Sequence, residues 1–316
     1  MRAYLDFEKP VAELEARIDE LRAAEVAKNG NPGEEIGRLE ARASEALREV
    51  YAQLSPWQKM QVARHPQRPH CLDFVKGLIE DFTPLAGDRK FGEDEAIVCG
   101  LGRFRGEPIC LIGQEKGSTT ESRLRHNFGM ARPEGYRKAA RLMELADRFS
   151  LPVFAFIDTA GAFPGVDAEE RGQAEAIARS TDACLALGAP NIALVIGEGG
   201  SGGAVALATA NRTLMLEHAV YSVISPEGAA SILWRDSARA EEAASSMRIT
   251  AQDLLRLGVI DAIVPEPLGG AHRDPQAAVL AAGEALAVQL GNLSGRDAAA
   301  IRAERADKFL SIGRRL

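Results

Sequence analysis

A glycine-rich segment at residues 196–204 has the residue types best suited to chemistry. It reads Ile-Gly-Glu-Gly-Gly-Ser-Gly-Gly-Ala and lies between a predicted buried strand and a predicted helix. Glycines let the backbone pass close to a ligand, and successive amides at a helix N-terminus direct N–H donors towards developing negative charge. Such amides, held away from water, lower the barrier of a reaction in which charge builds on an oxygen. The segment therefore predicts an oxyanion hole that needs no side-chain nucleophile.

A second glycine-containing segment at residues 158–165 follows the preceding predicted parallel strand. It reads Asp-Thr-Ala-Gly-Ala-Phe-Pro-Gly, and an ordinary turn is its alternative interpretation. Ligands of open α/β sheets bind in the crevice outside the carboxyl ends of the strands. Because both segments leave such ends on successive strands, we expect them to line one crevice.

The same glycines also fit a dinucleotide-binding pattern. Gly197, Gly199 and Gly202 match G-x-G-x-x-G, and Glu217 stands 20 residues after Gly197, where a ribose-binding acid is expected. However, the next predicted strand begins near Thr213, which leaves too little chain for the crossover helix of a unit of roughly 30 residues. A dinucleotide site is therefore disfavoured.

A nucleophile elbow is the third interpretation of the segment. Gly-x-Ser-x-Gly is centred on Ser201, and Asp261 and His272 follow in the order serine, acid, histidine. Nothing in the sequence around His272 indicates that it is buried or oriented. Ser201 is therefore expected to be a helix N-cap rather than a nucleophile. We interpret Glu198 as an exposed loop carboxylate in preference to an acid or base.

Two regions of different periodicity position these segments. Apolar residues at steps of three and four predict a helical hairpin over residues 11–54 with a turn at 29–33, and Ser55-Pro56 predicts the start of a further short helix that ends by residue 69. We place the N-terminal helical region at 1–85. Residues 86–316 form the predicted α/β domain, which ends in C-terminal helices.

In the α/β domain, strands alternate with helices, so we expect parallel strands with right-handed crossovers. Residues 96–101 and 108–113 are predicted as an antiparallel pair, and residues 153–157 and 192–196 as buried parallel strands. Two further predicted strands are 213–216 and 221–224. The predicted helices are 136–149, 168–187, a short one after Gly203, one from Thr250 to Gly258, and 275–310.

Composition excludes several classes of protein. The 316 residues carry a formal net charge of −7, which gives no basic field for nucleic acid. Four cysteines without a Cys-x-x-Cys pair indicate neither a zinc ribbon nor a disulfide framework, so no metal is expected in this chain. The sequence contains no run of about 18 apolar residues, so no membrane span is predicted. We expect a cytoplasmic protein that binds neither nucleic acid nor membrane.

Long ordered motifs resemble one family, the alpha subunit of the acetyl-coenzyme A carboxylase carboxyltransferase. The similarity spans nearly the whole chain, including Arg-His-Asn-Phe-Gly-Met and Pro-Glu-Pro-Leu-Gly-Gly-Ala-His-Arg. The segments that carry it are 63–69, 125–130, 133–139, 169–173, 197–204, 221–228 and 265–273.

The resemblance implies an α/β, crotonase-like (ClpP/crotonase) spiral of repeated ββα units behind the N-terminal helical hairpin. It implies transfer of carboxylate from carboxybiotin, carried on the biotin carboxyl carrier protein, to acetyl-CoA, which gives malonyl-CoA for fatty acid biosynthesis. The implied partners are a zinc-bearing beta subunit in an alpha2beta2 heterotetramer and a biotin carboxylase, which uses ATP for the whole complex. It favours acetyl-CoA over propionyl-CoA.

The resemblance also implies roles for residues of both glycine segments. The amides of Gly202 and Gly203 serve the ureido oxygen of biotin, and Gly199 and Gly200 shape the approach. The predicted substrate-binding residues are Ser201, Gly161, Ala162, Phe163, Pro164 and Gly165. Two residues depart from the family pattern, because Ala160 replaces the usual proline and Phe163 a common tyrosine.

Two questions stay open from the sequence. Arg123, Arg125 and His126 either contact a phosphate or carboxylate or form a solvated basic turn. A self-sufficient crotonase-like hydratase would need its own acid and base, for which only Glu198 is near. A scaffold that uses the hairpin and has lost catalysis is disfavoured by the intact glycines.

Overall fold

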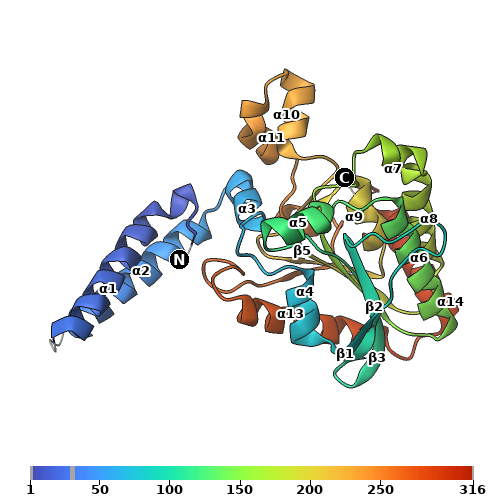
Figure 1. Ribbon diagram of the computed structural model, residues 1–316, viewed down its shortest axis with the longest axis horizontal. Helices are drawn as coiled ribbons and strands as arrows, with labels where there is room; N and C mark the ends of the chain where they lie inside the picture. The colour runs from blue at the N-terminus through green and yellow to red at the C-terminus, as the bar shows by residue number, and fades with distance from the viewer. Residues whose placement is uncertain (1–2, 29–32, 315–316) are drawn as a thin grey trace.

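A mixed sheet forms the centre of the computed structural model, which describes residues 3–28 and 33–314 (Figure 1). Within these residues the strand order is β1-β2-β3-β4-β5-β6-β8, and β7 pairs with β5. The strands are β1 (Glu80–Pro84), β2 (Ile97–Phe104), β3 (Glu107–Gln114), β4 (Val153–Thr159), β5 (Asn191–Gly200), β6 (Arg212–Leu216), β7 (Val220–Ser222) and β8 (Ala262–Val264).

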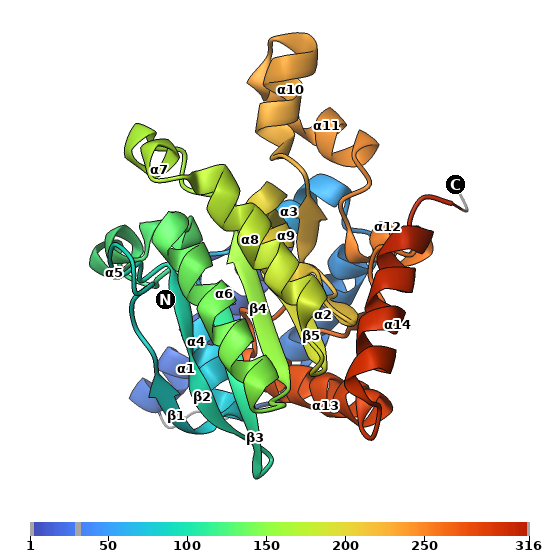
Figure 2. The ribbon, with the colours of Figure 1, turned by 90° about the vertical axis from the view of Figure 1, so that its right-hand side faces the viewer.

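The predicted antiparallel pair and the predicted parallel arrangement of the buried strands are confirmed. β2 and β3 form an antiparallel hairpin, whereas β3, β4, β5, β6 and β8 run parallel. Every residue of β4 and β5 is buried, as expected for strands covered on both faces. Helices α6 (Pro133–Arg148) and α8 (Gln173–Ala186) cover one face (Figure 2), while α4 (Cys71–Leu78) and α13 (Pro275–Leu293) lie across the sheet from them.

Some elements differ from the sequence prediction. The helix expected over 168–187 is broken into α7 (Val166–Glu170) and α8, because Gly172 adopts a left-handed conformation with φ of 82°. Helix α4 and strands β1 and β8 are among the elements that the sequence analysis did not predict. β1 is a mostly exposed, polar edge strand, and such strands lack the apolar alternation that reveals a buried one.

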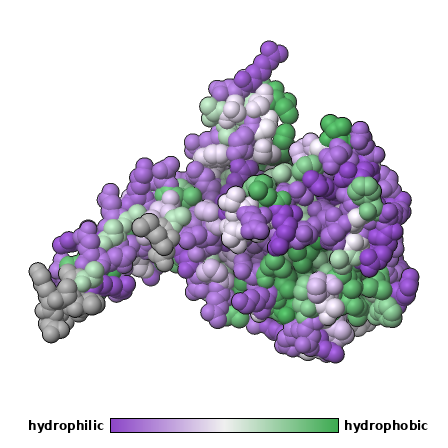
Figure 3. All heavy atoms as spheres, in the orientation of Figure 1, coloured by the Kyte–Doolittle hydropathy of each residue, from purple (hydrophilic) through white to green (hydrophobic). Residues whose placement is uncertain are grey.

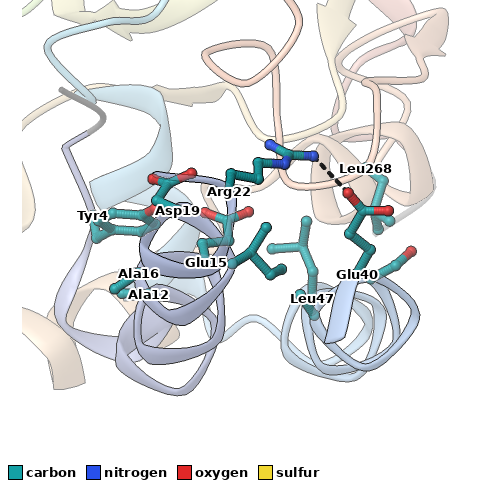
Figure 4. A pocket seen from close by; sticks show the side chains of 12 residues that line it. Tyr4, Ala12, Glu15, Ala16, Asp19, Arg22, Glu40, Leu47 and Leu268 are labelled. Atoms are coloured by element: carbon teal, nitrogen blue, oxygen red, sulfur yellow. Dashed lines mark hydrogen bonds and ion pairs between the residues drawn. The ribbon is translucent and has the colours of Figure 1, made fainter. Parts of the chain in front are cut away.

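The N-terminal helical hairpin is confirmed as α1 (Lys9–Lys28) and α2 (Gly33–Ala52), which project from the body of the molecule (Figure 1). Ile18, Ile36 and Ala43 are buried between the arms. A groove of about 680 Å³ runs along the hairpin and is lined by both arms and Leu268 (Figure 4). The predicted turn at 29–33 lies mostly outside the described residues, and the division at residue 85 stays a prediction.

Local capping signals are also confirmed. Ser55 accepts a hydrogen bond from Gln58 N at the start of α3 (Pro56–Ala63), and Thr250 accepts one from Asp253 N at the start of α12 (Ala251–Arg256). The remaining helices are α5 (Thr120–Arg125), α9 (Ser201–Ala208), α10 (Pro226–Trp234), α11 (Ala240–Ser246) and α14 (Ala298–Ser311), with short 3-10 turns at Asp6–Glu8, Asn127–Gly129 and Ser237–Arg239.

The predicted C-terminal helix is two helices, α13 and α14, bent by 115° against each other. Together they have the length and composition of a broken membrane span. In the described part of the chain, no single helix is long and apolar enough to cross a membrane.

Candidate active site

The first glycine segment is a direct junction between strand and helix. β5 continues to Gly200 and α9 begins at Ser201, whose φ is 51°. The prediction of Ser201 as the N-cap is wrong, because Gly200 takes that position and makes no side-chain cap. The first four amides of a helix lack intrahelical acceptors. The amides of Gly202 and Gly203 therefore lie in an uncapped first turn.

The two glycine segments touch each other, as the predicted shared crevice requires. A Cβ atom on Gly200 would lie 2.2 Å from the carbonyl oxygen of Ala160. One on Gly203 would lie 2.7 Å from the carbonyl carbon of Gly161 and 2.8 Å from the amide nitrogen of Ala162. Since real Cβ atoms do not approach so closely, glycine is required at both positions. By contrast, a Cβ on Gly202 would have its nearest neighbour, Ile177, at an ordinary 3.5 Å.

The second segment is held in shape without the proline that Ala160 replaces. Thr159 Oγ1 accepts a hydrogen bond from the Gly161 amide at 3.1 Å and donates one to the Gly161 carbonyl at 2.7 Å. The amide of Phe163 donates to Ala131 O at 2.9 Å. Among the described residues, the amide of Ala162 has no recorded acceptor. One further backbone donor is thus available beside the first turn of α9.

The end of this segment leads into α7. Gly165 is the N-cap of α7, and a Cβ atom there would lie 2.3 Å from the ring of Phe163. The guanidinium of Arg132 lies over that ring, 4.6 Å from its centroid. Pro164 and Gly165 therefore follow an aromatic ring that is itself fixed by a cation–π contact.

Glu198 is buried, so its interpretation as an exposed carboxylate is wrong. Only 4% of its surface is accessible, because β5 carries it into the centre of the fold. Arg64 binds both of its carboxylate oxygens, at 3.1 Å from Nε and 2.7 Å from Nη2. Lys116 Nζ lies 3.7 Å from Glu198 Oε2. A carboxylate held in this way is poorly suited to act as the acid or base of a hydratase.

Asp158 is a central residue of the site to which the sequence analysis gave no role. Its Oδ1 accepts a hydrogen bond from the Glu198 amide at 3.0 Å and lies 2.7 Å from Lys116 Nζ. His70 Nδ1 lies 3.6 Å from its other oxygen. Burial alone would raise the pKa of Asp158, but Lys116 and His70 outweigh it and lower the pKa to about 2. The available signal was a carboxylate directly after five apolar strand residues.

A cavity of about 260 Å³ opens beside Asp158. Arg123 lines it and donates from Nε to Gly117 O at 3.2 Å. Arg125 instead pairs with Glu95 at 3.2 Å, and His126 Nδ1 lies 2.6 Å from Glu95 O. The lining residues are Ala63, Arg64, His65, Pro66, His70, Lys116, Gly117, Arg123, Phe128, Asp158 and Ala160.

The residues of the alternative hydrolase site do not come together. Asp261 Oδ2 accepts hydrogen bonds from Thr213 N at 2.6 Å and Lys308 Nζ at 2.5 Å. The ring of His272 stacks on that of His65 with centroids 3.8 Å apart. Within the described residues neither Asp261 nor His272 has a recorded contact with Ser201, so a hydrolase triad is not formed.

The acid of the dinucleotide pattern has a structural role. Glu217 Oε2 accepts a hydrogen bond from Glu266 N at 3.2 Å. Across residues 3–28 and 33–314, no group of three or more His, Cys, Asp or Glu side chains is arranged to hold a metal ion. The four cysteines are buried and free.

The mixed sheet with its run of parallel strands and the two touching glycine turns define an α/β protein of the crotonase fold. Solved structures of a transcarboxylase and of a malonate decarboxylase share this architecture. The transcarboxylase 12S core matches with a TM-score of 0.54 at 20% identity, over 66% of this chain and 40% of that one. A malonate decarboxylase from Pseudomonas, solved with coenzyme A, matches with a TM-score of 0.56 at 18% identity, over 70% of this chain and 89% of that one.

The family follows from the sequence comparison. The model of the acetyl co-enzyme A carboxylase carboxyltransferase-like family matches residues 4–313. The acetyl-coenzyme A carboxylase carboxyl transferase subunit alpha of Methylobacterium nodulans is 73% identical over 318 residues, and that of Xanthobacter autotrophicus is 71% identical over 317 residues, each covering all of both chains. This chain belongs to the acetyl-coenzyme A carboxylase carboxyltransferase family.

Proposed function

We propose that this chain is the alpha subunit of a biotin-dependent carboxyltransferase. With a beta subunit it transfers carboxylate from carboxybiotin to acetyl-CoA and produces malonyl-CoA. The observation that carries the proposal is the 73% identity over the full length of a curated alpha subunit. The junction of β5 and α9 supplies the chemistry that such a reaction needs.

Negative charge develops on two oxygens in this reaction. As the carboxylate leaves biotin, its ureido oxygen becomes an anion, and as the acetyl group is deprotonated, its thioester oxygen becomes an enolate. We assign the amides of Gly202 and Gly203 to the ureido oxygen, because they lie in the uncapped first turn of α9. Gly202 is partly exposed, and a Cβ atom there would meet only Ile177, at an ordinary 3.5 Å, so the packing of the fold does not itself require glycine at this position. The beta subunit then serves the enolate.

We assign the remaining predicted residues to the path by which biotin reaches these amides. Gly199 and Gly200 end β5, and their lack of side chains lets the second segment lie directly against it. We propose that the backbone from Gly161 to Gly165 borders biotin, with the free amide of Ala162 as an added donor. Ser201 contributes its backbone, because its hydroxyl has no base beside it among the described residues.

Exposed apolar side chains on and near α10 and α7 form a surface that a partner subunit could cover. Val223, Ile232 and Leu233 on and before α10 expose 81%, 72% and 68% of their surface, and Val166 on α7 exposes 77%. Figure 3 shows hydrophobic residues on the projecting α10 and beside α7. Apolar patches of this kind typically mark interaction sites. We propose that the beta subunit covers them in an alpha2beta2 heterotetramer.

The other partners follow from the proposed reaction. Carboxybiotin reaches the site on the biotin carboxyl carrier protein, after a biotin carboxylase has loaded it with ATP. ATP thus belongs to the whole complex, and no site for it is proposed in this chain. We place the complex in the cytoplasm and the boundary of the carboxyltransferase domain near residue 85.

The deciding experiment measures malonyl-CoA formation by this chain alone and mixed with a beta subunit. We expect malonyl-CoA formation only when the beta subunit is present. Gly202→Val should abolish it, because its side chain fills the approach, while Ser201→Ala should keep most of it. Activity of the chain alone, or its loss in Ser201→Ala, would contradict amide-based carboxyl transfer.

A further inference from the structure

Strand β5 is irregular immediately before the glycine junction. Its pairing with β4 runs from Ile157↔Val195 to Thr159↔Gly199, so three residues of β5, at 196–198, oppose Asp158 alone. On its other edge β5 pairs with β6 through Val195 and with β7 from Glu198 onwards. The regular pairing of β5 with β4 and with β6 therefore ends at the same residue, Val195. A bulge of this kind bends a strand and redirects the residues after it.

On the β4 edge, the carboxylate of Asp158 replaces the missing ladder acceptor. Its Oδ1 accepts the hydrogen bond of the Glu198 amide at 3.0 Å. A Cβ atom on Gly197 would lie 2.5 Å from the same oxygen, so glycine is needed for this contact. Lys116 Nζ, 2.7 Å from Asp158 Oδ1, compensates the buried charge.

On the opposite edge, the guanidinium of Arg68 replaces the missing ladder donor. Its Nε donates to Ile196 O at 2.7 Å. Its Nη1 and Nη2 bind both oxygens of Glu266, at 2.9 Å and 2.6 Å. Glu266 also accepts from the amide of His218, between β6 and β7, at 2.9 Å. This buried ion pair thus bridges the gap where β5 changes from one neighbour to the next.

We propose that Asp158 and Arg68 are positioning residues for the carboxyl-transfer reaction, because they hold the β5 bulge that directs the first-turn amides of α9. Lys116 and Glu266 support them by neutralising their charges. This inference rests on the proposed function for its kinetic consequence. The hydrogen bond that Asp158 accepts from the Glu198 amide can be tested without measuring catalysis.

Two substitutions of Asp158 separate this role from a charge effect. Asparagine keeps an acceptor for the Glu198 amide, whereas leucine of similar size removes it. In the mixture with the beta subunit, Asp158→Leu should lower kcat about 100-fold, the loss typical of a displaced oxyanion donor. Asp158→Asn should stay within about tenfold of wild type, and KM for acetyl-CoA should change little in either.

Hydrogen exchange of the amides at 198–204 supplies a readout independent of activity. We expect faster exchange in Asp158→Leu than in Asp158→Asn, even if the wild-type mixture forms no malonyl-CoA and the proposed function fails. Equal exchange in the two variants, or equal loss of kcat, would overturn the inference.

If Asp158→Leu does not fold, Lys116→Met tests the support of the β5 bulge by removing the ion pair with Asp158. The Lys116 side chain is 18% exposed. The substitution should lower kcat about tenfold, a loss of the size expected for one charge-assisted contact, and Lys116→Arg should restore most of it. Lys76→Met, at an exposed lysine of α4, is the matched control and should leave kcat unchanged. Unchanged kcat in Lys116→Met would likewise overturn the proposal.

Discussion

Gly200 lies directly against the carbonyl group of Ala160, so that a Cβ atom on Gly200 would stand 2.2 Å from that oxygen. The contact joins the ends of β4 and β5 through backbone alone. It brings the second glycine segment beside the first turn of α9. The geometry of the site therefore depends on the absence of a side chain at Gly200, as it does at Gly203.

Gly200→Ala should destabilise the fold and disrupt the site, because either the strand end or the Ala160 loop must move. We expect a loss of about 2–4 kcal/mol in the free energy of unfolding. Gly202→Ala is the control for stability, since its Cβ finds ordinary contact distances and alanine favours a helix. Urea unfolding of both variants checks this, and equal midpoints would contradict the steric argument.

Arg305 should be essential for stability although it lies far from the site. Its guanidinium is fully buried and donates five hydrogen bonds, and burial lowers its pKa to about 10. The acceptors are the carbonyls of Leu185, Leu187 and Ala189 and the side chains of Asn191 and Asn211.

Arg305→Met leaves these acceptors unpaired in the interior, at an expected cost of about 3 kcal/mol or more. The exposed Arg148→Met, at the end of α6, is the control and should change stability by less than about 0.5 kcal/mol. Thermal unfolding distinguishes the two. A melting temperature of Arg305→Met close to that of wild type would show that the buried bonds contribute little.

Stability should fall in mild acid because His272 is buried. Burial, with His65, Arg68 and Arg273 nearby, lowers its pKa to about 3, whereas an unfolded histidine titrates near 6.5. Between these values the unfolded chain binds a proton that the folded chain does not. The stability contribution of neutral His272 is therefore complete above about pH 6.5 and is lost as the pH falls.

The loss should reach about 3 kcal/mol at pH 4. Urea unfolding of wild type and His272→Gln between pH 7 and pH 4 measures it, and the variant should show a shallower decline. Parallel declines in the two proteins would mean that other groups cause the acid sensitivity.

Tyr51 should fasten the helical hairpin to the body. Its hydroxyl donates to Glu8 Oε1 at 3.0 Å, and Arg273 Nη2 lies 3.2 Å from the same oxygen. Tyr51→Phe leaves the buried Glu8 with one partner fewer, which should cost about 1–2 kcal/mol and speed hydrogen exchange within α1 and α2. Tyr136→Phe removes a buried hydroxyl without a recorded partner and should cost little. Unchanged exchange in Tyr51→Phe would exclude this anchoring role.

The elements of this fold were predictable wherever a local pattern specifies them. Apolar spacing indicated the hairpin, and continuous apolar runs indicated β4 and β5. Ser55 and Thr250 marked helix starts because their caps involve residues three positions away. The break at Gly172 was missed, because a glycine within a helical pattern does not by itself decide whether the helix continues.

The sequence by itself determined that two glycine segments end successive parallel strands, since backbone conformation and strand burial depend on neighbouring residues. The tertiary structure decided which charges surround them. The buried carboxylate of Glu198 is paired with Arg64, 134 positions away. Arg68 reaches the carbonyl of Ile196 across 128 positions. Pairing in a buried site depends on where distant segments meet, and local periodicity carries no information about that.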